Sequence, residues 1–228
     1  MTNLALPSSV LVVGASRGIG LELVRQYRAE GVRVTATARD DAGLHALTSL
    51  GAKALRVDVA KMASVSSLAW QIDGEGFDTV FFVAGVYGPQ QAGLDTPTEA
   101  EFDDVMHANV LGPMRVIPQV LDALAPGARL GILSSRMGSI GGRTNPSGWL
   151  YRASKAAVNS VLKDTALVLA DRAVCVALHP GWVRTDMGGA DADLSVEASA
   201  RDLRRTLATR QPADSGGFFN HDGTPIPW

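Results

Sequence analysis

The sequence predicts an α/β fold, a doubly wound parallel sheet of about seven strands with helices on both faces. Three observations support this prediction. Short β-branched runs alternate with longer stretches of helical periodicity along most of the chain. Strand runs such as Val10 to Val13 are apolar on both faces, as in strands covered by helices on both sides. A glycine-rich turn separates this first strand from its helix, as in the Rossmann fold.

The first half of the chain repeats one unit of strand followed by helix. Strands are predicted at 10–13, 32–38, 53–57 and 79–84. Helices are predicted at 18–30, 41–50 and 63–72. Gly31 and Gly51 follow the first two helices, where glycine commonly ends a helix. This alternation favours parallel strands joined by helical crossovers.

The second half continues the alternation and ends in a different kind of segment. Further helices are predicted at 99–124, 149–170 and, on the surface, 195–210, with strands at 129–134 and 173–179. Pro113 and Pro118 predict a kink or break in the first of these helices. Residues 216–228 are rich in Gly and Pro, and Trp228 is expected to pack against the body or a subunit. No repeat or linker interrupts the pattern, so we expect a single domain over 1–228.

Composition narrows the class of protein. The 228 residues are 46% hydrophobic and 19% charged, which is typical of a globular protein with a sizeable core. A net charge of -2 gives no electrostatic reason to expect nucleic acid or a membrane as partner. The lone Cys175 excludes an internal disulfide and is expected in the core, and the four His share no metal spacing, so no metal is predicted. No targeting segment or run of ~20 apolar residues is apparent, and a cytoplasmic location is expected.

Gly14-Ala15-Ser16-Arg17-Gly18-Ile19-Gly20 forms the turn between the first strand and its helix. Gly14 suits the tight turn, Gly18 close approach of the backbone to a ligand, and Gly20 packing of the helix on the strand. The free amides and the positive end of the helix dipole then face a pyrophosphate. The turn therefore predicts a dinucleotide site.

Tyr151 and Lys155 are separated by one helical turn in the segment 149–170. The spacing places both side chains on one face, roughly 5.4 Å apart along the axis. An ammonium so close is expected to lower the pKa of the phenol from its usual ~10. The pair then predicts a proton donor that works near neutral pH.

These motifs resemble those of the short-chain dehydrogenase/reductase family along nearly the whole chain. The shared segments are the G-x-x-x-G-x-G turn, Asp58-Val59, Ala84-Gly85, Asn109, Ser134-Ser135, Tyr151-x-x-x-Lys155, and Pro180-Gly181 with Val183 and Thr185. The resemblance is greatest to the C-factor/Sniffer-like carbonyl reductase branch, on residues 135–139, 151–155, 179–189 and 222–225.

The resemblance implies a catalytic set of Asn109, Ser135, Tyr151 and Lys155. Hydride would pass from a nicotinamide to a carbonyl carbon while Tyr151 protonates the oxygen and Ser135 donates a hydrogen bond to it. Lys155 would hold the ribose hydroxyls, and Asn109 a water that links Lys155 to solvent. Asn109 is alternatively a helix-kink residue that bonds the backbone, and Ser134 is the alternative catalytic serine.

The resemblance also implies which residues bind the cofactor. They are Gly14, Ser16, Arg17, Gly18, Ile19, Gly20, Arg39, Asp58, Val59, Ala84, Gly85, Tyr151, Lys155, Pro180, Gly181, Val183 and Thr185. The end of the second strand is where an NAD site needs a carboxylate. Here that position is Ala38, followed by Arg39, and two guanidiniums with Arg17 favour NADP(H) over NAD(H). Asp40 is the counter-argument, because a shift of two residues would restore an acid.

Two departures from the family pattern are visible. Phe82 and Val83 stand where the family usually has two asparagines, which predicts altered local stability and cofactor-loop position. Ser135 lies sixteen residues before Tyr151, so the loop 140–148, which carries Arg143 and Asn145, is expected to be enlarged and to shape substrate choice.

Several apolar side chains are candidates for a substrate pocket or for the core: Tyr87, Met137, Trp149, Trp182 and Met187. They favour small apolar or aromatic aldehydes and ketones, or the corresponding alcohols. A catalytically weak, NADP-binding signalling or redox-sensing protein is the alternative. The resemblance implies a homodimer or homotetramer through the helices at 99–125 and 149–170.

Overall fold

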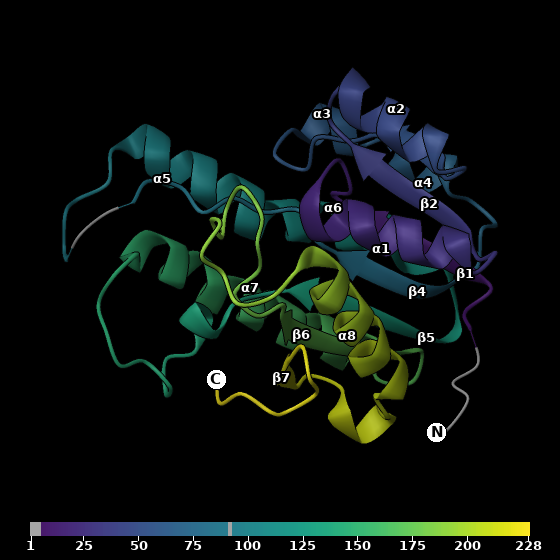
Figure 1. Cartoon of the computed structure of the whole chain (residues 1–228). Helices are drawn as coiled ribbons and strands as arrows, with labels where there is room; N and C mark the ends of the chain where they lie inside the picture. The colour runs from purple at the N-terminus through teal and green to yellow at the C-terminus, as the bar shows by residue number, and fades with distance from the viewer. Residues whose placement is uncertain (1–5, 91–92) are drawn as a thin grey trace.

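A computed structural model of the protein describes residues 6–90 and 93–228. Its seven strands form one parallel sheet in the order β3-β2-β1-β4-β5-β6-β7 (Figure 1). The strands are β1 (Ser9–Val13), β2 (Arg33–Ala38), β3 (Lys53–Arg56), β4 (Phe77–Phe82), β5 (Leu124–Leu133), β6 (Ala173–His179) and β7 (Phe218–Asn220). The predicted fold class, a doubly wound Rossmann sheet, is confirmed.

Helices cover both faces of this sheet. The α-helices are α1 (Gly18–Ala29), α2 (Asp41–Ser49), α3 (Met62–Val65), α4 (Leu68–Gln71), α5 (Glu99–Met106), α6 (Gly112–Val120), α7 (Trp149–Val168) and α8 (Val196–Thr209). Short 3-10 or π-helical turns are η1 (His107–Leu111), η2 (Leu121–Ala123), η3 (Arg136–Gly138) and η4 (Pro212–Asp214). None of the helices in the described ranges is long and apolar enough to cross a bilayer.

The sheet separates two hydrophobic cores. On one face α3, α4, α6 and α7 pack around side chains such as Leu68 and Leu162. On the other face α1, α2 and α8 pack around Leu23 and Leu203 (Figure 1). Successive side chains of a strand point to opposite faces, so Phe81 joins the second core and Phe82 the first. Cys175 is buried in the first core, as predicted.

The long helix predicted at 99–124 is interrupted, as the prolines indicated. α5 ends at Met106 and passes through the π-helical turn η1 before α6 begins at Gly112. Pro113 lies in the first turn of α6, where the missing N–H costs no helical hydrogen bond, and Pro118 lies inside α6. A π-helical turn widens the backbone locally, and this one presents Asn109 to the site described below.

Three predicted elements differ from the structure. The helix predicted at 63–72 is two short helices, because hydroxyls of Ser66 and Ser67 bond locally at the break. β5 begins at Leu124, five residues before the prediction. The Gly- and Pro-rich tail contains β7, which no strand prediction covered, paired with the end of β6.

The rest of the tail packs on the body, as predicted for Trp228. Its ring stacks on Phe218 with centroids 5.5 Å apart, and its carbonyl accepts a hydrogen bond from the amide of Gly141 at 2.8 Å. The indole keeps 43% of its surface exposed. The C-terminus therefore supports the beginning of the loop 140–148.

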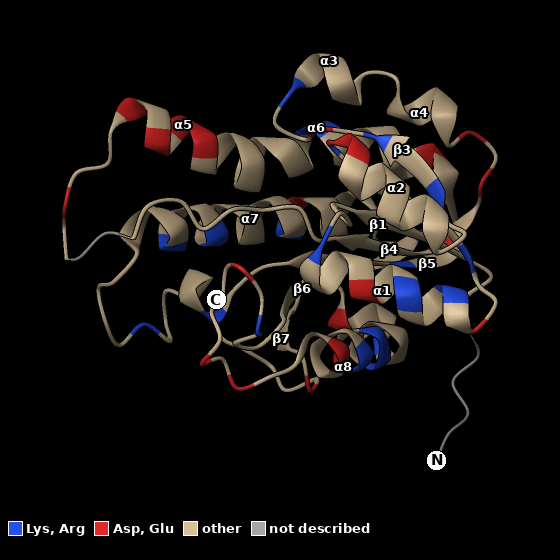
Figure 2. Ribbon diagram, turned by 45° about the horizontal axis from the view of Figure 1, so that its top comes forward, with Lys and Arg blue, Asp and Glu red and all other residues tan. Residues whose placement is uncertain are grey.

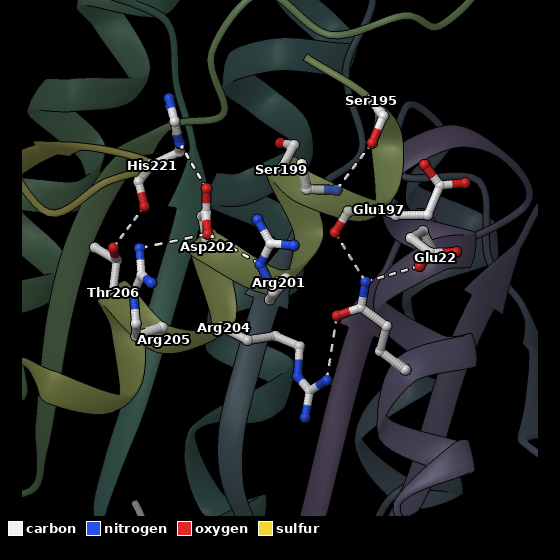
Figure 3. Close-up of polar contacts among 12 residues, drawn as sticks. Glu22, Ser195, Glu197, Ser199, Arg201, Asp202, Arg204, Arg205, Thr206 and His221 are labelled. Carbon is white, nitrogen blue, oxygen red and sulfur yellow. Dashed lines mark hydrogen bonds and ion pairs between the residues drawn. The ribbon is translucent and has the colours of Figure 1, made fainter. Parts of the chain in front are cut away.

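The predicted surface helix α8 is buried on one face against α1. Arg204 donates to Gln26 at 3.2 Å, and Gln26 donates to Glu22 at 2.7 Å (Figure 3). The Arg204 guanidinium also lies 4.1 Å from the centroid of the Tyr27 ring. Figure 2 shows Lys, Arg, Asp and Glu positions along both helices.

Candidate active site

Two adjoining cavities lie at the carboxyl ends of the strands. The larger, about 750 Å³, opens where the strand order reverses between β1 and β4, the position at which doubly wound sheets bind ligands. The smaller, about 500 Å³, lies between η3, the loop 140–148 and the segment after β6. Tyr151 lines both cavities. A ligand in each would meet at this side chain.

The glycine-rich turn is shaped by close backbone packing. Gly14 has φ 86°, and a Cβ there would come within 2.6 Å of Cα of Ala84. The amide of Gly14 donates to Oγ1 of Thr37 at 2.9 Å, which ties the turn to β2. Gly20 lines neither cavity, and a Cβ there would collide with the carbonyl oxygen of Gly14. Its role is therefore helix packing.

Most of the predicted cofactor-binding residues line the larger cavity. They are Gly14, Ser16, Arg17, Gly18, Ile19, Arg39, Asp58, Val59, Ala84, Gly85, Tyr151, Lys155, Pro180 and Thr185. Gly181 and Val183 instead line the smaller cavity, together with Pro180 and Thr185. The segment after β6 thus borders both spaces.

The end of β2 bears on the choice of cofactor. Ala38 is the last residue of this strand, and Arg39 is exposed at the larger cavity. Asp40 also lines the cavity, but its side chain caps α2 by accepting from the amide of Gly43 at 2.8 Å. This use of the carboxylate weakens the alternative in which Asp40 receives a ribose hydroxyl. Arg17 pairs across the cavity mouth with Asp186 at 2.9 Å.

Tyr151 lies in the first turn of α7 and is buried. Its ring stacks on Tyr87 with centroids 4.6 Å apart. Burial raises the pKa of Tyr151 to about 12, although a hydrogen bond with Ser135 opposes this rise. The phenol is therefore held protonated at neutral pH.

Lys155 lies on the same face of α7 as Tyr151, as the spacing predicted. It does not have the predicted effect on the pKa of Tyr151. Nζ lies 5.6 Å from the centroid of the Tyr151 ring and donates to the carbonyl oxygen of Leu133 at 3.0 Å. Burial lowers the pKa of Lys155 to about 8. The expected lowering of the Tyr151 pKa by Lys155 is wrong for this structure, because the loss of solvent around the phenol dominates.

Asn109 projects from η1 toward the ends of β4 and α7. Its Oδ1 accepts from the amide of Val86, and its Nδ2 donates to the carbonyl of Val86, both at 2.8 Å. Nδ2 also donates to Oγ of Ser154 at 2.9 Å. These bonds fit the alternative in which Asn109 bonds the backbone. A Cβ at Gly85 would come within 3.0 Å of Oδ1 of Asn109 and 3.4 Å of Nζ of Lys155, so glycine leaves both groups accessible.

The two serines after β5 have different surroundings. Oγ of Ser134 donates to Oδ1 of Asn159 at 2.5 Å and lies 3.4 Å from the carbonyl oxygen of Lys155. Oγ of Ser135 accepts from the amide of Met137 at 3.1 Å, which leaves its proton for another partner. Ser135 lines the smaller cavity beside Tyr151. This geometry favours Ser135 as the serine that contacts a substrate.

The smaller cavity contains four of the five predicted pocket residues: Tyr87, Met137, Trp182 and Met187. Trp149 does not line it, because its indole turns away and donates to the carbonyl oxygen of Asp95 at 2.9 Å. In the predicted loop 140–148, Asn145 lines the cavity, whereas Arg143 is exposed outside it.

Several residues at the site were missed by the sequence reasoning. Arg136, Arg152 and His179 line the smaller cavity, and Ser154 and Asn159 hold the predicted polar residues. Arg152 and Ser154 lie between Tyr151 and Lys155 in sequence, which was the available signal. The partners of Ser134 and Asn109 depend on tertiary packing and had no such signal.

A further pair of missed residues supports the segment after β6. A Cβ at Gly181 would come within 3.1 Å of Cδ2 of His221, so the imidazole packs directly on this turn. Nδ1 of His221 lies 3.3 Å from Oδ2 of Asp202 on α8 (Figure 3). The packing of His221, which itself contacts Asp202, thus supports the turn at Gly181.

Phe82 and Val83 occupy the two positions where the family usually has asparagines. Phe82 is buried in the core, and the amides of Val83 and Ala84 both donate to the carbonyl oxygen of Val13, at 2.9 and 3.0 Å. Backbone bonds to β1 therefore hold the loop at the cavity. In the described part of the chain, no group of three His, Cys, Asp or Glu residues is placed to hold a metal.

Comparison with known proteins gives the family. The short chain dehydrogenase model matches residues 8–193. The 1-hydroxy-2-glutathionyl-2-methyl-3-butene dehydrogenase of Rhodococcus sp. (strain AD45) is 36% identical over 231 residues, 97% of this chain and 100% of that protein.

Solved structures give the same result. A short-chain dehydrogenase/reductase from Burkholderia multivorans with bound NADP has a TM-score of 0.88 and 31% identity, covering 97% of this chain and 100% of that one. Carbonyl reductase Sniffer of D. melanogaster has a TM-score of 0.85 and 30% identity, covering 97% and 99%. The predicted likeness to Sniffer is confirmed. With motifs, fold and relatives in agreement, this chain belongs to the short-chain dehydrogenase/reductase family and is an oxidoreductase of that family.

Proposed function

We propose that the protein is an NADP(H)-dependent carbonyl reductase that acts on small apolar or aromatic aldehydes and ketones. The observation that carries this proposal is the position of Tyr151. This buried phenol lies between a cavity with a dinucleotide turn and a second cavity lined by Tyr87 and Met137. A proton donor is thereby placed where a cofactor and a carbonyl compound would meet.

The residues of the larger cavity fit NADP(H). The open turn at Gly14 and Gly18 admits a pyrophosphate, and the exposed guanidinium of Arg39 suits a ribose phosphate. Asp40 already uses Oδ1 to cap α2, which leaves only its other oxygen for a ribose hydroxyl. The Burkholderia multivorans relative with bound NADP supports the same choice. When bound, the cofactor supplies the hydride that adds to the carbonyl carbon.

The residues of this chain supply the proton and hold the oxygen. Tyr151 gives its proton to the oxygen as charge develops there, and Ser135 donates a hydrogen bond to the same atom. Lys155 holds the cofactor ribose, and Asn109 fixes the backbone beside it. Because the pKa of Tyr151 is raised to about 12, the protonated form needed for reduction predominates at neutral pH.

The test is NADPH consumption with a panel of aromatic and aliphatic aldehydes and ketones, with the alcohol product measured by chromatography. We expect one alcohol formed for each NADPH consumed. A second candidate is a catalytically weak, NADP-binding sensor, which the replacement of both family asparagines by Phe82 and Val83 favours. NADPH binding without alcohol formation from any compound would support the sensor and overturn the reductase.

Assembly and location complete the proposal. Leu167 and Val168 on α7 and Phe102 on α5 are exposed apolar side chains on the two helices predicted to form the subunit contact. We propose a homodimer or homotetramer through these helices, a single domain over 1–228, and a cytoplasmic location. Light scattering coupled to gel filtration measures the assembly, and a monomeric mass at micromolar concentration would contradict it.

A further inference from the structure

Arg152 is a buried cation that borders the smaller cavity. The residue is 5% exposed and follows Tyr151 directly on α7. Nε donates to the carbonyl oxygen of Ser147 and one Nη to Oδ1 of Asn145, both at 2.6 Å. The other Nη reaches the carbonyl oxygen of Met137 at 3.4 Å, a long and weak contact. All three acceptors are neutral.

No carboxylate of the described residues forms an ion pair with this charge. Within residues 6–90 and 93–228, no Asp or Glu oxygen lies within 4.0 Å of Arg152. Burial, and then repulsion from Arg143, lower the pKa of Arg152. Burying a cation without a paired anion is costly, and such sites are usually completed by a partner. The acidic residues of α5, red on the ribbon in Figure 2, make no ion pair with it.

The rest of the cavity has the same electrostatic character. Arg136 also lines it, and its described lining includes neither Asp nor Glu. The pKa of Asp222 is lowered first by hydrogen bonds from Thr224 and less by the charges of His221 and Arg136. Asp222 forms no direct ion pair with Arg136 within 4.0 Å. The cavity therefore combines apolar walls with an uncompensated positive charge.

The guanidinium of Arg152 and the hydroxyls of Tyr151 and Ser135 border the same cavity, so one substrate molecule can contact all three. Tyr151 lines both cavities, and Ser135 lines the smaller one. Arg152 lines the same cavity and bonds η3 and the loop 140–148. Tyr87 and Met137 supply apolar surface of the same cavity. A substrate with its carbonyl at Tyr151 can extend an anionic group toward Arg152.

We propose that the smaller cavity binds carbonyl compounds that carry a carboxylate, with the carboxylate paired to Arg152 and the carbonyl at Tyr151 and Ser135. This proposal rests on the proposed reductase function and specifies its substrate class as apolar or aromatic aldehyde acids. A carboxylate replaces the weak contact to Met137 and forms charge-assisted hydrogen bonds with the guanidinium. Arg136 adds a second cation at the cavity rim.

The first test compares two aldehydes of nearly equal shape in the wild-type protein. Para-formylbenzoate carries a carboxylate, and para-formylbenzamide carries a neutral amide in its place. We expect kcat/KM for the acid to exceed that for the amide about tenfold, mainly through a lower KM, because one charge-assisted pair is worth about that factor. Equal values, or a preference for the amide, would overturn the inference while leaving the reductase function in place.

Variants locate the charge that matters. In Arg152→Gln the acid-to-amide ratio should fall to about one, and in Arg136→Gln it should fall less. Arg33→Gln is the matched control, because Arg33 is an exposed arginine at the opposite end of the sheet, and its ratio should stay at the wild-type value. An unchanged ratio in folded Arg152→Gln would overturn the assignment. If Arg152→Gln does not fold, the wild-type ratio alone decides.

A binding measurement separates this inference from the reductase function. Isothermal titration of para-(hydroxymethyl)benzoate into the protein saturated with NADPH measures carboxylate binding at this site without turnover. We expect heat of binding that is lost with para-(hydroxymethyl)benzamide. Binding of neither compound would contradict the inference even if aldehydes are reduced, and binding without any aldehyde reduction would support the site and overturn the reductase.

Discussion

Nζ of Lys155 lies 5.6 Å from the centroid of the Tyr151 ring, yet it donates its hydrogen bond to the main-chain oxygen of Leu133 at 3.0 Å. Both side chains are buried, and burial disfavours the charged form of each. The pKa of the phenol rises to about 12 and that of the ammonium falls to about 8. The pair is thus arranged to keep a proton on Tyr151 and to lose one from Lys155 first.

The pH dependence of catalysis should follow Lys155. Below pH 8 its ammonium is charged and can hold the cofactor ribose, and above pH 8 this charge is lost. We expect kcat/KM for NADPH, which reports the free enzyme, to be level near neutral pH and to fall about tenfold per pH unit well above 8. Initial rates at constant ionic strength measure it. A level profile through pH 10 would refute this role of Lys155.

Ser135→Ala and Ser134→Ala should fail in different ways. Removing the Ser135 hydroxyl deletes a donor to the developing oxyanion, so kcat should fall about a hundredfold. It also leaves the amide of Met137 without its acceptor, which should cost about 1 kcal/mol of unfolding free energy. Removing the Ser134 hydroxyl leaves Oδ1 of Asn159 without this donor and should cost about 1 kcal/mol of unfolding free energy. Steady-state kinetics and urea unfolding on both variants separate the roles. A larger loss of kcat in Ser134→Ala than in Ser135→Ala would instead assign the catalytic role to Ser134.

Arg39→Ala should reduce the preference for NADPH. A guanidinium–phosphate contact is worth about 1.5 to 3 kcal/mol, so KM for NADPH should rise about ten- to a hundredfold while KM for NADH changes little. Arg33→Ala removes the same charge at the start of β2 and serves as the control. Equal increases in KM for both cofactors would show that Arg39 does not read the phosphate.

The sequence patterns that succeeded depend on residues close together in the chain. The glycine turn at Gly14 and the pairing of Tyr151 with Lys155 on one face follow from local spacing, and the structure has both. The tail strand β7 was missed because a strand of three residues has no readable period and forms only by pairing with β6. Trp149 was misplaced because a distant carbonyl, that of Asp95, sets its orientation.

Electrostatic properties of the site were the least predictable from sequence. The spacing suggested that Lys155 lowers the pKa of Tyr151, but burial of the phenol reverses the direction. Arg152 appeared in sequence only as a residue between Tyr151 and Lys155. Its importance depends on three neutral acceptors and on the absence of a carboxylate around it among the described residues, which are products of tertiary packing.

Acid should destabilise the fold through His179. Burial, with repulsion from Arg136 and His221, lowers the pKa of His179 to about 4. The unfolded chain binds this proton near pH 6.5, so stability is lost as pH falls from about 6.5 toward 4, by about 2 to 3 kcal/mol. The free energy of unfolding, measured with urea, should vary less with pH across this range in His179→Gln than in the wild type. The same acid slope in variant and wild type would assign the loss to other groups.

If Tyr151 donates the proton in carbonyl reduction, Tyr151→Phe should lose most of its turnover. The variant keeps the ring that stacks on Tyr87 and removes only the hydroxyl. We predict that kcat for an aromatic aldehyde falls about a thousandfold, since general acid catalysis contributes 10² to 10⁴, while the Kd of NADPH changes less than about threefold. Aldehyde reduction by Tyr151→Phe at the wild-type rate, with NADPH bound normally, would show that Tyr151 is not the proton donor.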